Sequence, residues 1–204
     1  MAVLEHTLGI LTRPDDEWVA IRKERQSFKQ VFLSHIPFLA FIPTLCFYYG
    51  VTQVGWQFSG EVVKLTHSSA MSLAAISYFA MLAGVFILGE FINWMSRTYG
   101  VSGSEEQKHY AGTALAVYAV TPMMLAGIFM VYPAVWVNAL AFLIFGAWSV
   151  YLVFEGTPII MNLNKERAYL YAFSIITVGL TLLVATRIAS VILWGIGVGP
   201  VYTD

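Results

Sequence analysis

The chain has 204 residues, of which 58% are apolar and only 11% charged, with a formal net charge of −1. Soluble domains have about 25% charged residues, so this composition argues against a soluble enzyme, a disordered protein and a nucleic-acid-binding protein. The mean hydropathy of +0.71 predicts an all-α polytopic membrane protein with little mass outside the bilayer.

The segment 1–30 predicts an amphipathic helix rather than a membrane span. Thr12 stands where an N-cap is expected, before Pro14 and a run of acidic residues. Side chains then recur at spacings of three and four on one face, at Trp18, Ile21, Arg25, Phe28 and Phe32. A helix of this kind lies on a membrane surface, as a lipid anchor or as a docking face for a cytosolic partner. The residues expected to make that contact are Trp18, Arg22, Lys23, Arg25 and Lys29.

Five apolar windows follow, each close to the length of about 20 residues that crosses a bilayer. They cover residues 31–52, 70–95, 111–132, 134–155 and 169–194. Residues 31–195 are therefore expected to form a five-helix domain, and 196–204 a short external tail. Pro133 separates the third and fourth windows, and Pro122 should kink the third. The sequence Ser104-Glu105-Glu106-Gln107 predicts a capped start for that third helix.

The lysines and arginines predict the orientation of these spans. One side has nine of them, and the other side has only Lys64. Because basic residues accumulate in cytoplasmic loops, we expect a cytoplasmic N-terminus and an external C-terminus in an inner (plasma) membrane. The nine residues are Arg13, Arg22, Lys23, Arg25, Lys29, Arg97, Lys108, Lys165 and Arg167.

Ionisable groups within the spans are the candidate functional residues, because burying them in a bilayer is costly. Glu90 should lie about 8 Å below the inner boundary, with Asn93 and Arg97 on the same helical face. Glu155 from the fourth span and His35 from the first are expected at a similar depth. Together these groups would bind a cation or pass protons, or they would form a structural hydrogen-bond network between helices.

Arg187 is the other ionisable residue within a span, in the outer half of the fifth. Its side chain either extends to the outer interface or contacts carbonyl groups or a lipid phosphate in the outer leaflet. Small residues spaced four apart, such as Ala80 with Gly84 and Ala185 with Ala189, allow close helix contacts and a possible homodimer.

Signatures of catalysis and cofactor binding are missing from the sequence. It has one cysteine, Cys46, no nucleophile elbow, no phosphate-binding loop and no His-x-x-x-His pair. We therefore expect no enzyme activity, no cofactor and no metal site.

Several short motifs are similar to a known family. They are Pro14, Trp18 and Ile21 before the first span, Tyr118-Ala119-Val120-Thr121-Pro122 and Gly127 in the third, Trp148-Ser149-Val150-Tyr151-Leu152 and Gly156 in the fourth, and Lys165-Glu166-Arg167-Ala168 before the fifth. From about residue 8 to 195 the chain resembles the bacterial branch of the Yip family, proteins named for interaction with Ypt/Rab small GTPases. The resemblance implies five membrane helices and a cytosolic N-terminus, and in eukaryotic relatives roles in vesicle trafficking and membrane shaping. Asp15-Asp16-Glu17-Trp18 stands where those relatives have a Gly-Pro-Leu-Trp-type motif, so a Rab partner is not carried over.

Two functional hypotheses follow from the sequence. The first is a non-enzymatic inner-membrane scaffold or adaptor that acts on lipid, or on a membrane or cytosolic protein partner, through its basic N-terminal segment. The alternative is a small transporter or an ion- or proton-conducting bundle that uses Glu90, Asn93, Glu155 and His35.

Overall fold

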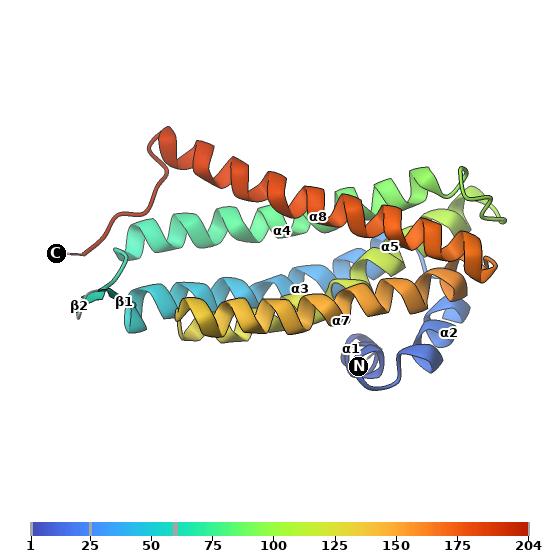
Figure 1. The fold of residues 1–204 in the computed structure, drawn as a ribbon, viewed down its shortest axis with the longest axis horizontal. Coiled ribbons are helices and arrows are strands. Elements are labelled where there is room, and N and C mark those ends of the chain that lie inside the picture. Colours follow the sequence, from blue (N-terminus) through green and yellow to red (C-terminus); the bar gives the residue numbers. More distant parts are fainter. Residues whose placement is uncertain (1, 25, 59–60, 204) are drawn as a thin grey trace.

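The structure is a computed structural model that describes residues 2–24, 26–58 and 61–203, and it is an elongated bundle of long helices (Figure 1). Within these described ranges, five helical segments are long and apolar enough to cross a membrane, which confirms the predicted all-α class and the five spans. They are α3 (Phe28–Tyr49) continued by η1 (Gly50–Val54), α4 (His67–Met95), the three-part segment Glu105–Val131, α7 (Val135–Met161) and α8 (Lys165–Gly195).

The N-terminal segment forms two helices, α1 (Ala2–Thr12) and α2 (Pro14–Glu24), and both precede the first span. The predicted N-terminal helix before the first span is thus present, but its expected face from Trp18 to Phe32 is divided, because α2 ends at Glu24 and Phe28 and Phe32 lie in α3. Ser27 caps the start of α3, because its Oγ accepts a hydrogen bond from the Gln30 amide at 3.3 Å and its own amide donates to Gln30 Oε1 at 3.1 Å. This capping box favours a new helix start, which separates α2 from α3.

The third span is interrupted in the way that its prolines predict. It consists of α5 (Glu105–Ala119), α6 (Thr121–Ala126) and the 3₁₀ segment η2 (Gly127–Val131). The break between α5 and α6 confirms the expected kink before Pro122, which has no amide hydrogen to continue the helix. The predicted cap is also confirmed, since Ser104 Oγ accepts a hydrogen bond from the Gln107 amide at 3.3 Å.

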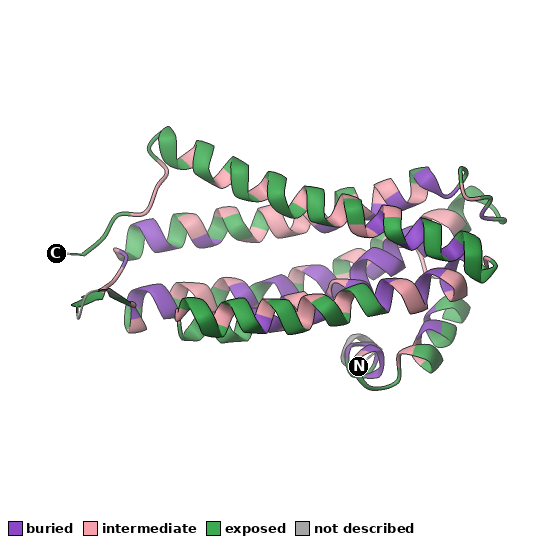
Figure 2. Cartoon of the chain, in the orientation of Figure 1, coloured by how far each residue is buried: buried purple, intermediate pink, exposed green. Residues whose placement is uncertain are grey.

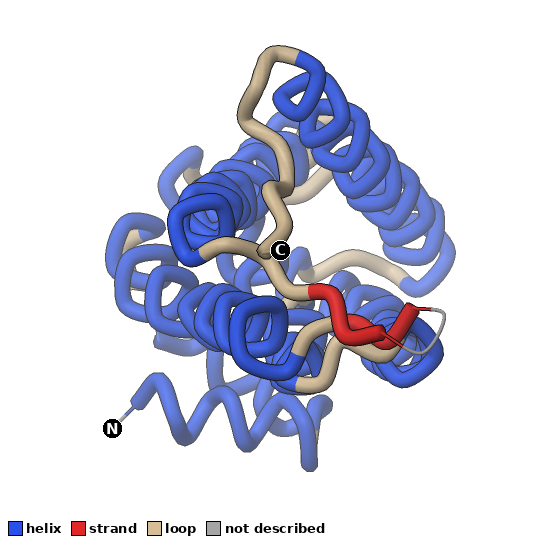
Figure 3. The backbone as a smooth tube through the Cα atoms, turned by 90° about the vertical axis from the view of Figure 1, so that its left-hand side faces the viewer, coloured by secondary structure: helices blue, strands red, loops and turns tan. Residues whose placement is uncertain are grey.

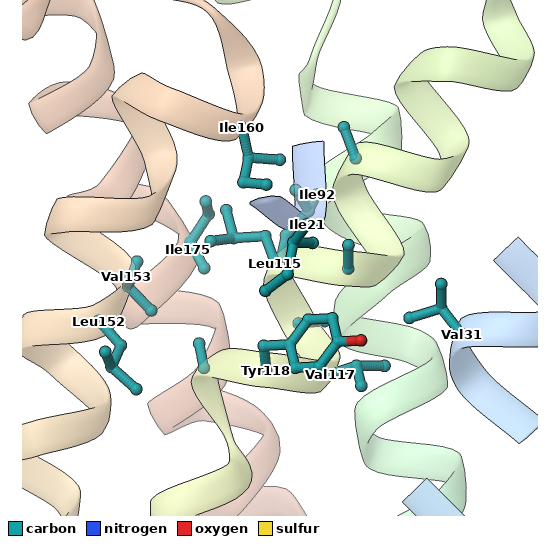
Figure 4. Close-up of a cluster of buried hydrophobic side chains, with 14 of the residues drawn as sticks. Ile21, Val31, Ile92, Leu115, Val117, Tyr118, Leu152, Val153, Ile160 and Ile175 are labelled. Carbon is teal, nitrogen blue, oxygen red and sulfur yellow. The ribbon is translucent and has the colours of Figure 1, made fainter. Parts of the chain in front are cut away.

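The core of the bundle is built around α5. Every residue of α5 from Tyr110 to Ala119 is buried, whereas the other long helices each keep a large exposed face (Figure 2). Side chains from five other helices pack around α5 in Figure 4, and the labelled ones are Ile21, Val31, Ile92, Leu152, Val153, Ile160 and Ile175. The middle helix is therefore shielded from lipid along that stretch.

The last helix, α8, is the most exposed of the spans. Its buried residues lie in its first half, at Ala168, Tyr171, Ala172 and Ile175, and the helix diverges from α7 toward its C-terminal end (Figure 1). The tail then returns to the start of α4, where the Thr66 amide donates to the Val201 carbonyl at 2.8 Å. A short antiparallel hairpin of β1 (Trp56–Phe58) and β2 (Glu61–Val63) lies at this same end of the bundle (Figure 3).

Candidate functional site

The candidate site is the end of the bundle that holds α1, α2 and the connections 96–104 and 162–164, which we call the charged end. All the ion pairs between described side chains lie here, in α1, α2, the last turns of α4, the connection that follows it and the first turns of α5. The opposite end, at residues 50–66, 127–134 and 196–203, has one basic residue, Lys64. The described charges are thus concentrated where the N-terminal helices pack on the bundle.

Trp18 and Ile21 fix α2 to the bundle, and both side chains are completely buried. The Trp18 indole lies against Gly156 of α7 and meets the Tyr118 ring edge to face, with ring centres 6.3 Å apart. The backbone carbonyl of Ile21 accepts a hydrogen bond of 2.5 Å from the Tyr110 hydroxyl. The expectation that Trp18 contacts the membrane surface is therefore wrong, because a glycine 138 positions later leaves room for its ring inside the bundle.

The basic residues of the N-terminal segment have a different environment from Trp18. Arg22 and Lys23 are exposed on α2, and Lys29 is exposed on the first turn of α3. The Lys29 ammonium lies 6.0 Å from the centre of the Phe28 ring. Arg25 lies outside the described residues. Arg22, Lys23 and Lys29 are thus available to lipid or to a partner.

His6 joins α1 to α2 through two carboxylates. Its Nδ1 hydrogen-bonds Glu17, and its Nε2 lies 2.8 Å from Glu24 Oε1. His6 also meets the Tyr118 ring edge to face at 5.7 Å. Sequence reasoning missed this cluster, although the spacing of seven between Glu17 and Glu24 places them on one face of α2. The position of His6 opposite that face depends on how α1 packs on α2, which only the tertiary structure shows.

Glu90 has a partner that the sequence did not suggest. His109 of α5 lies with its Nε2 2.6 Å from Glu90 Oε1, and both side chains are partly exposed. Asn93 lines an adjacent open cavity of about 400 Å³ together with Lys29 and His109. Arg97 does not join Glu90, because its guanidinium pairs with Glu105 at 2.9 Å.

The other two members of the expected polar cluster lie with other partners. His35 is completely buried, with its Nε2 3.2 Å from the Thr121 hydroxyl and its ring 4.8 Å from the Tyr118 ring centre. Glu155 faces Asp15 of α2 and Lys165 of α8. Across the described residues, no three His, Cys, Asp or Glu side chains are grouped so as to hold a metal ion. The structure therefore does not bring Glu90, Glu155 and His35 together as one site.

Arg187 is exposed on α8, in the half of that helix that has no buried side chain among the described residues. It forms no ion pair with a described acidic residue. Its position fits a contact with the outer leaflet, which stays a prediction.

Comparison with known proteins identifies the family. The sequence profile of the Yip1 domain matches residues 8–186. The chain belongs to the Yip family. Two Escherichia coli proteins named inner membrane protein YohC, from strain K12 and from strain O6:H1 (CFT073), are each 33% identical over 195 residues, which is 95% of this chain and 98% of the relative. No solved structure matches the chain. With its five apolar helices and these relatives, this is a Yip-family inner membrane protein.

Proposed function

We propose that this Yip-family protein is a non-enzymatic membrane scaffold or adaptor whose charged end binds lipid or a protein partner. One observation carries the proposal: burial of Trp18 and Ile21 fixes α2 to the bundle, so its exposed charged side has a set position. Asp16, Arg22 and Lys23 are exposed on that helix. A recognition surface held in place by the fold loses less conformational entropy on binding than a free segment does.

The interior of the bundle supports a scaffold more than a conducting pathway. Among the described residues, apolar side chains from seven other helices form one buried cluster with those of α5, and the described ion pairs lie at the charged end. Ion or proton pathways through membranes are lined by polar groups or water along their length. A packed apolar centre fits a protein that presents surfaces rather than one that moves ions.

The scaffold proposal is tested by cross-linking in native membranes. A photoreactive amino acid replaces Val19, an exposed residue of α2, and we expect a reproducible lipid or protein adduct. The double change Arg22→Glu and Lys23→Glu should remove the adduct without unfolding the protein, because both side chains are exposed. Lys165→Glu with Arg167→Glu makes the same charge change at the same end, outside α2, and should keep the adduct. Equal adduct yields from both double variants would overturn the proposal.

The orientation is a separate part of this proposal. The nine-to-one distribution of basic residues supports a cytoplasmic charged end. A periplasm-active reporter enzyme fused after the C-terminal tail should then be active, and the same reporter fused before α1 should be inactive. The opposite pattern would place the charged end outside.

Conduction of an ion or of protons is the second candidate, and the Glu90–His109 pair beside the 400 Å³ cavity favours it. Purified protein in liposomes should then dissipate a pH or ion gradient. Glu90→Gln should abolish that flux, and Glu166→Gln, at an exposed residue of α8, should leave it unchanged. Absence of flux in the wild-type protein for all ions tested would exclude this candidate.

A further inference from the structure

A second cavity at the charged end lies next to the one lined by Asn93 and His109, and Lys29 lines both. It is open, has a volume of about 680 Å³, and lies between α1, the start of α3 and α5. Its lining residues are His6, Gln26, Lys29, Gln30, Leu33, Ser34 and Tyr118. Lys29 to Ser34 are within the first two turns of a membrane span and cover about 8 Å of its axis. The cavity therefore lies at the depth where lipid headgroups meet acyl chains.

Two of the polar residues lining this cavity belong to the buried interior of the protein. His6 is 8% exposed and Tyr118 is 4% exposed. In Figure 4 the Tyr118 oxygen points toward α3, the helix that carries Val31 and most of the cavity lining. The Tyr118 oxygen is not among the fully buried atoms that have no hydrogen-bond partner, and Tyr118 lines the cavity, so its hydroxyl can donate to a ligand there. His6 is held in place by Glu17 and Glu24, which accept its hydrogen bonds.

The rim of the cavity adds a cation and an apolar contact. Lys29 forms no ion pair with a described acidic residue, so its ammonium is available to an anion. Gln30 accepts hydrogen bonds from Ser27 through its oxygen, which leaves its amide nitrogen free to donate. Leu33, one turn further along α3, is 62% exposed. This lining suits a ligand with an anionic oxygen group and a hydrocarbon chain. The lysine, the amide nitrogen and the tyrosine hydroxyl can bind the oxygens, and the leucine can contact the chain.

We propose that this cavity binds the phosphodiester headgroup of a membrane phospholipid, with Lys29 and the Tyr118 hydroxyl on the phosphate and an acyl chain against Leu33. The inference rests on the proposed function and names the ligand class for its charged end. Glu17 and Glu24 do not line the cavity; both are hydrogen-bonded to His6, and Glu24 also accepts a hydrogen bond from Gln26. Free phosphate shares the headgroup chemistry but lacks the chain that Leu33 would contact.

Native mass spectrometry of the full-length protein in detergent micelles tests this site. We expect one phosphatidylglycerol or phosphatidylethanolamine molecule to bind each chain saturably, and diacylglycerol, which has no phosphate, not to be retained. Lys29→Ala should weaken binding about tenfold, and Tyr118→Phe by about threefold to tenfold, since each removes one hydrogen bond to the phosphate. Lys29→Arg should retain binding. Lys165→Ala, at an exposed lysine of the charged end outside the cavity and outside α2, should bind like wild type.

Several outcomes would overturn the site. Equal weakening by Lys165→Ala and Lys29→Ala would indicate general surface attraction, and retention of diacylglycerol would remove the role of the phosphate. Glycerophosphate binding as tight as the phospholipid would assign the cavity to a soluble phosphate compound. If lipid binding fails while the Val19 adduct still depends on Arg22 and Lys23, only the lipid site is lost and the scaffold proposal stands. Tyr118→Phe keeps the ring that packs on Trp18 and His35, so its unfolding temperature should match wild type.

Discussion

Substitution of Gly156 by alanine tests how α2 is held on the bundle. A Cβ atom at this position would lie 2.6 Å from Cε2 and 2.7 Å from Cζ2 of Trp18, and 2.9 Å from Cδ1 of Leu115. Carbon atoms pack comfortably at about 3.5–4.0 Å, so the indole must move by about 1 Å. Overpacking of this kind costs about 1–3 kcal/mol, and the helical preference of alanine over glycine returns about 0.5–1 kcal/mol. Taken from the middle of these two ranges, the net loss in the docking of α2 is about 1–2 kcal/mol.

Amide hydrogen exchange measures this loss locally. The helix α2 has 11 residues and is marginal on its own, so its amides exchange when it leaves the bundle. A loss of about 1–2 kcal/mol raises their exchange rate about 5- to 30-fold. Gly179→Ala is the matched control in α8, where a Cβ atom would meet nothing within 4 Å. It should leave exchange in α2 at the wild-type rate.

A second substitution separates packing from other effects of the alanine. Trp18→Leu removes the ring atoms that the new methyl group would meet. The double variant should therefore lose less docking free energy than the sum of the losses in the two single variants. The reasoning is refuted if Gly156→Ala leaves exchange in α2 unchanged, or if Gly179→Ala accelerates it equally.

Three further substitutions test other parts of the fold by thermal or denaturant unfolding in micelles. Ser104→Ala removes the cap of α5 and should cost about 1 kcal/mol, and an unchanged midpoint would show that the cap is not needed. Tyr171→Phe should cost about 1 kcal/mol because the Tyr171 hydroxyl donates to the Ile92 carbonyl; wild-type stability would argue against that bond. Gly127→Ala should cost about 1–3 kcal/mol, because its Cβ would overlap Pro43 Cβ and lie 2.6 Å from Pro43 Cα, and a stable variant would contradict this close approach.

The electrostatic pairs of the charged end make different contributions to function and stability. Glu90 and His109 are partly exposed, so their pair contributes about 0–1 kcal/mol and its loss should not unfold the protein. His6 has side-chain exposure of only 10% between two acids, so it ties α1 to α2 more firmly. This difference makes Glu90 suitable for functional substitution and His6 a residue whose removal changes the structure.

The sequence by itself determined the five membrane spans, the break at Pro122 and the cap at Ser104. These features depend on local properties: the length of an apolar run, the missing amide hydrogen of proline, and a side chain three residues from its backbone partner. Each is complete within a few turns of chain. The sequence could therefore indicate them without any knowledge of how the helices pack.

Only the tertiary structure decided which polar groups meet and which face of α2 is buried. Glu90 pairs with His109 rather than Glu155 or His35, and Trp18 lies against Gly156 rather than on the membrane surface. An aromatic and basic helix has the same pattern whether its apolar side meets lipid or another helix, because both are apolar surroundings. The choice depends on a gap left by a glycine far along the chain, and no periodicity within residues 1–30 contains that information.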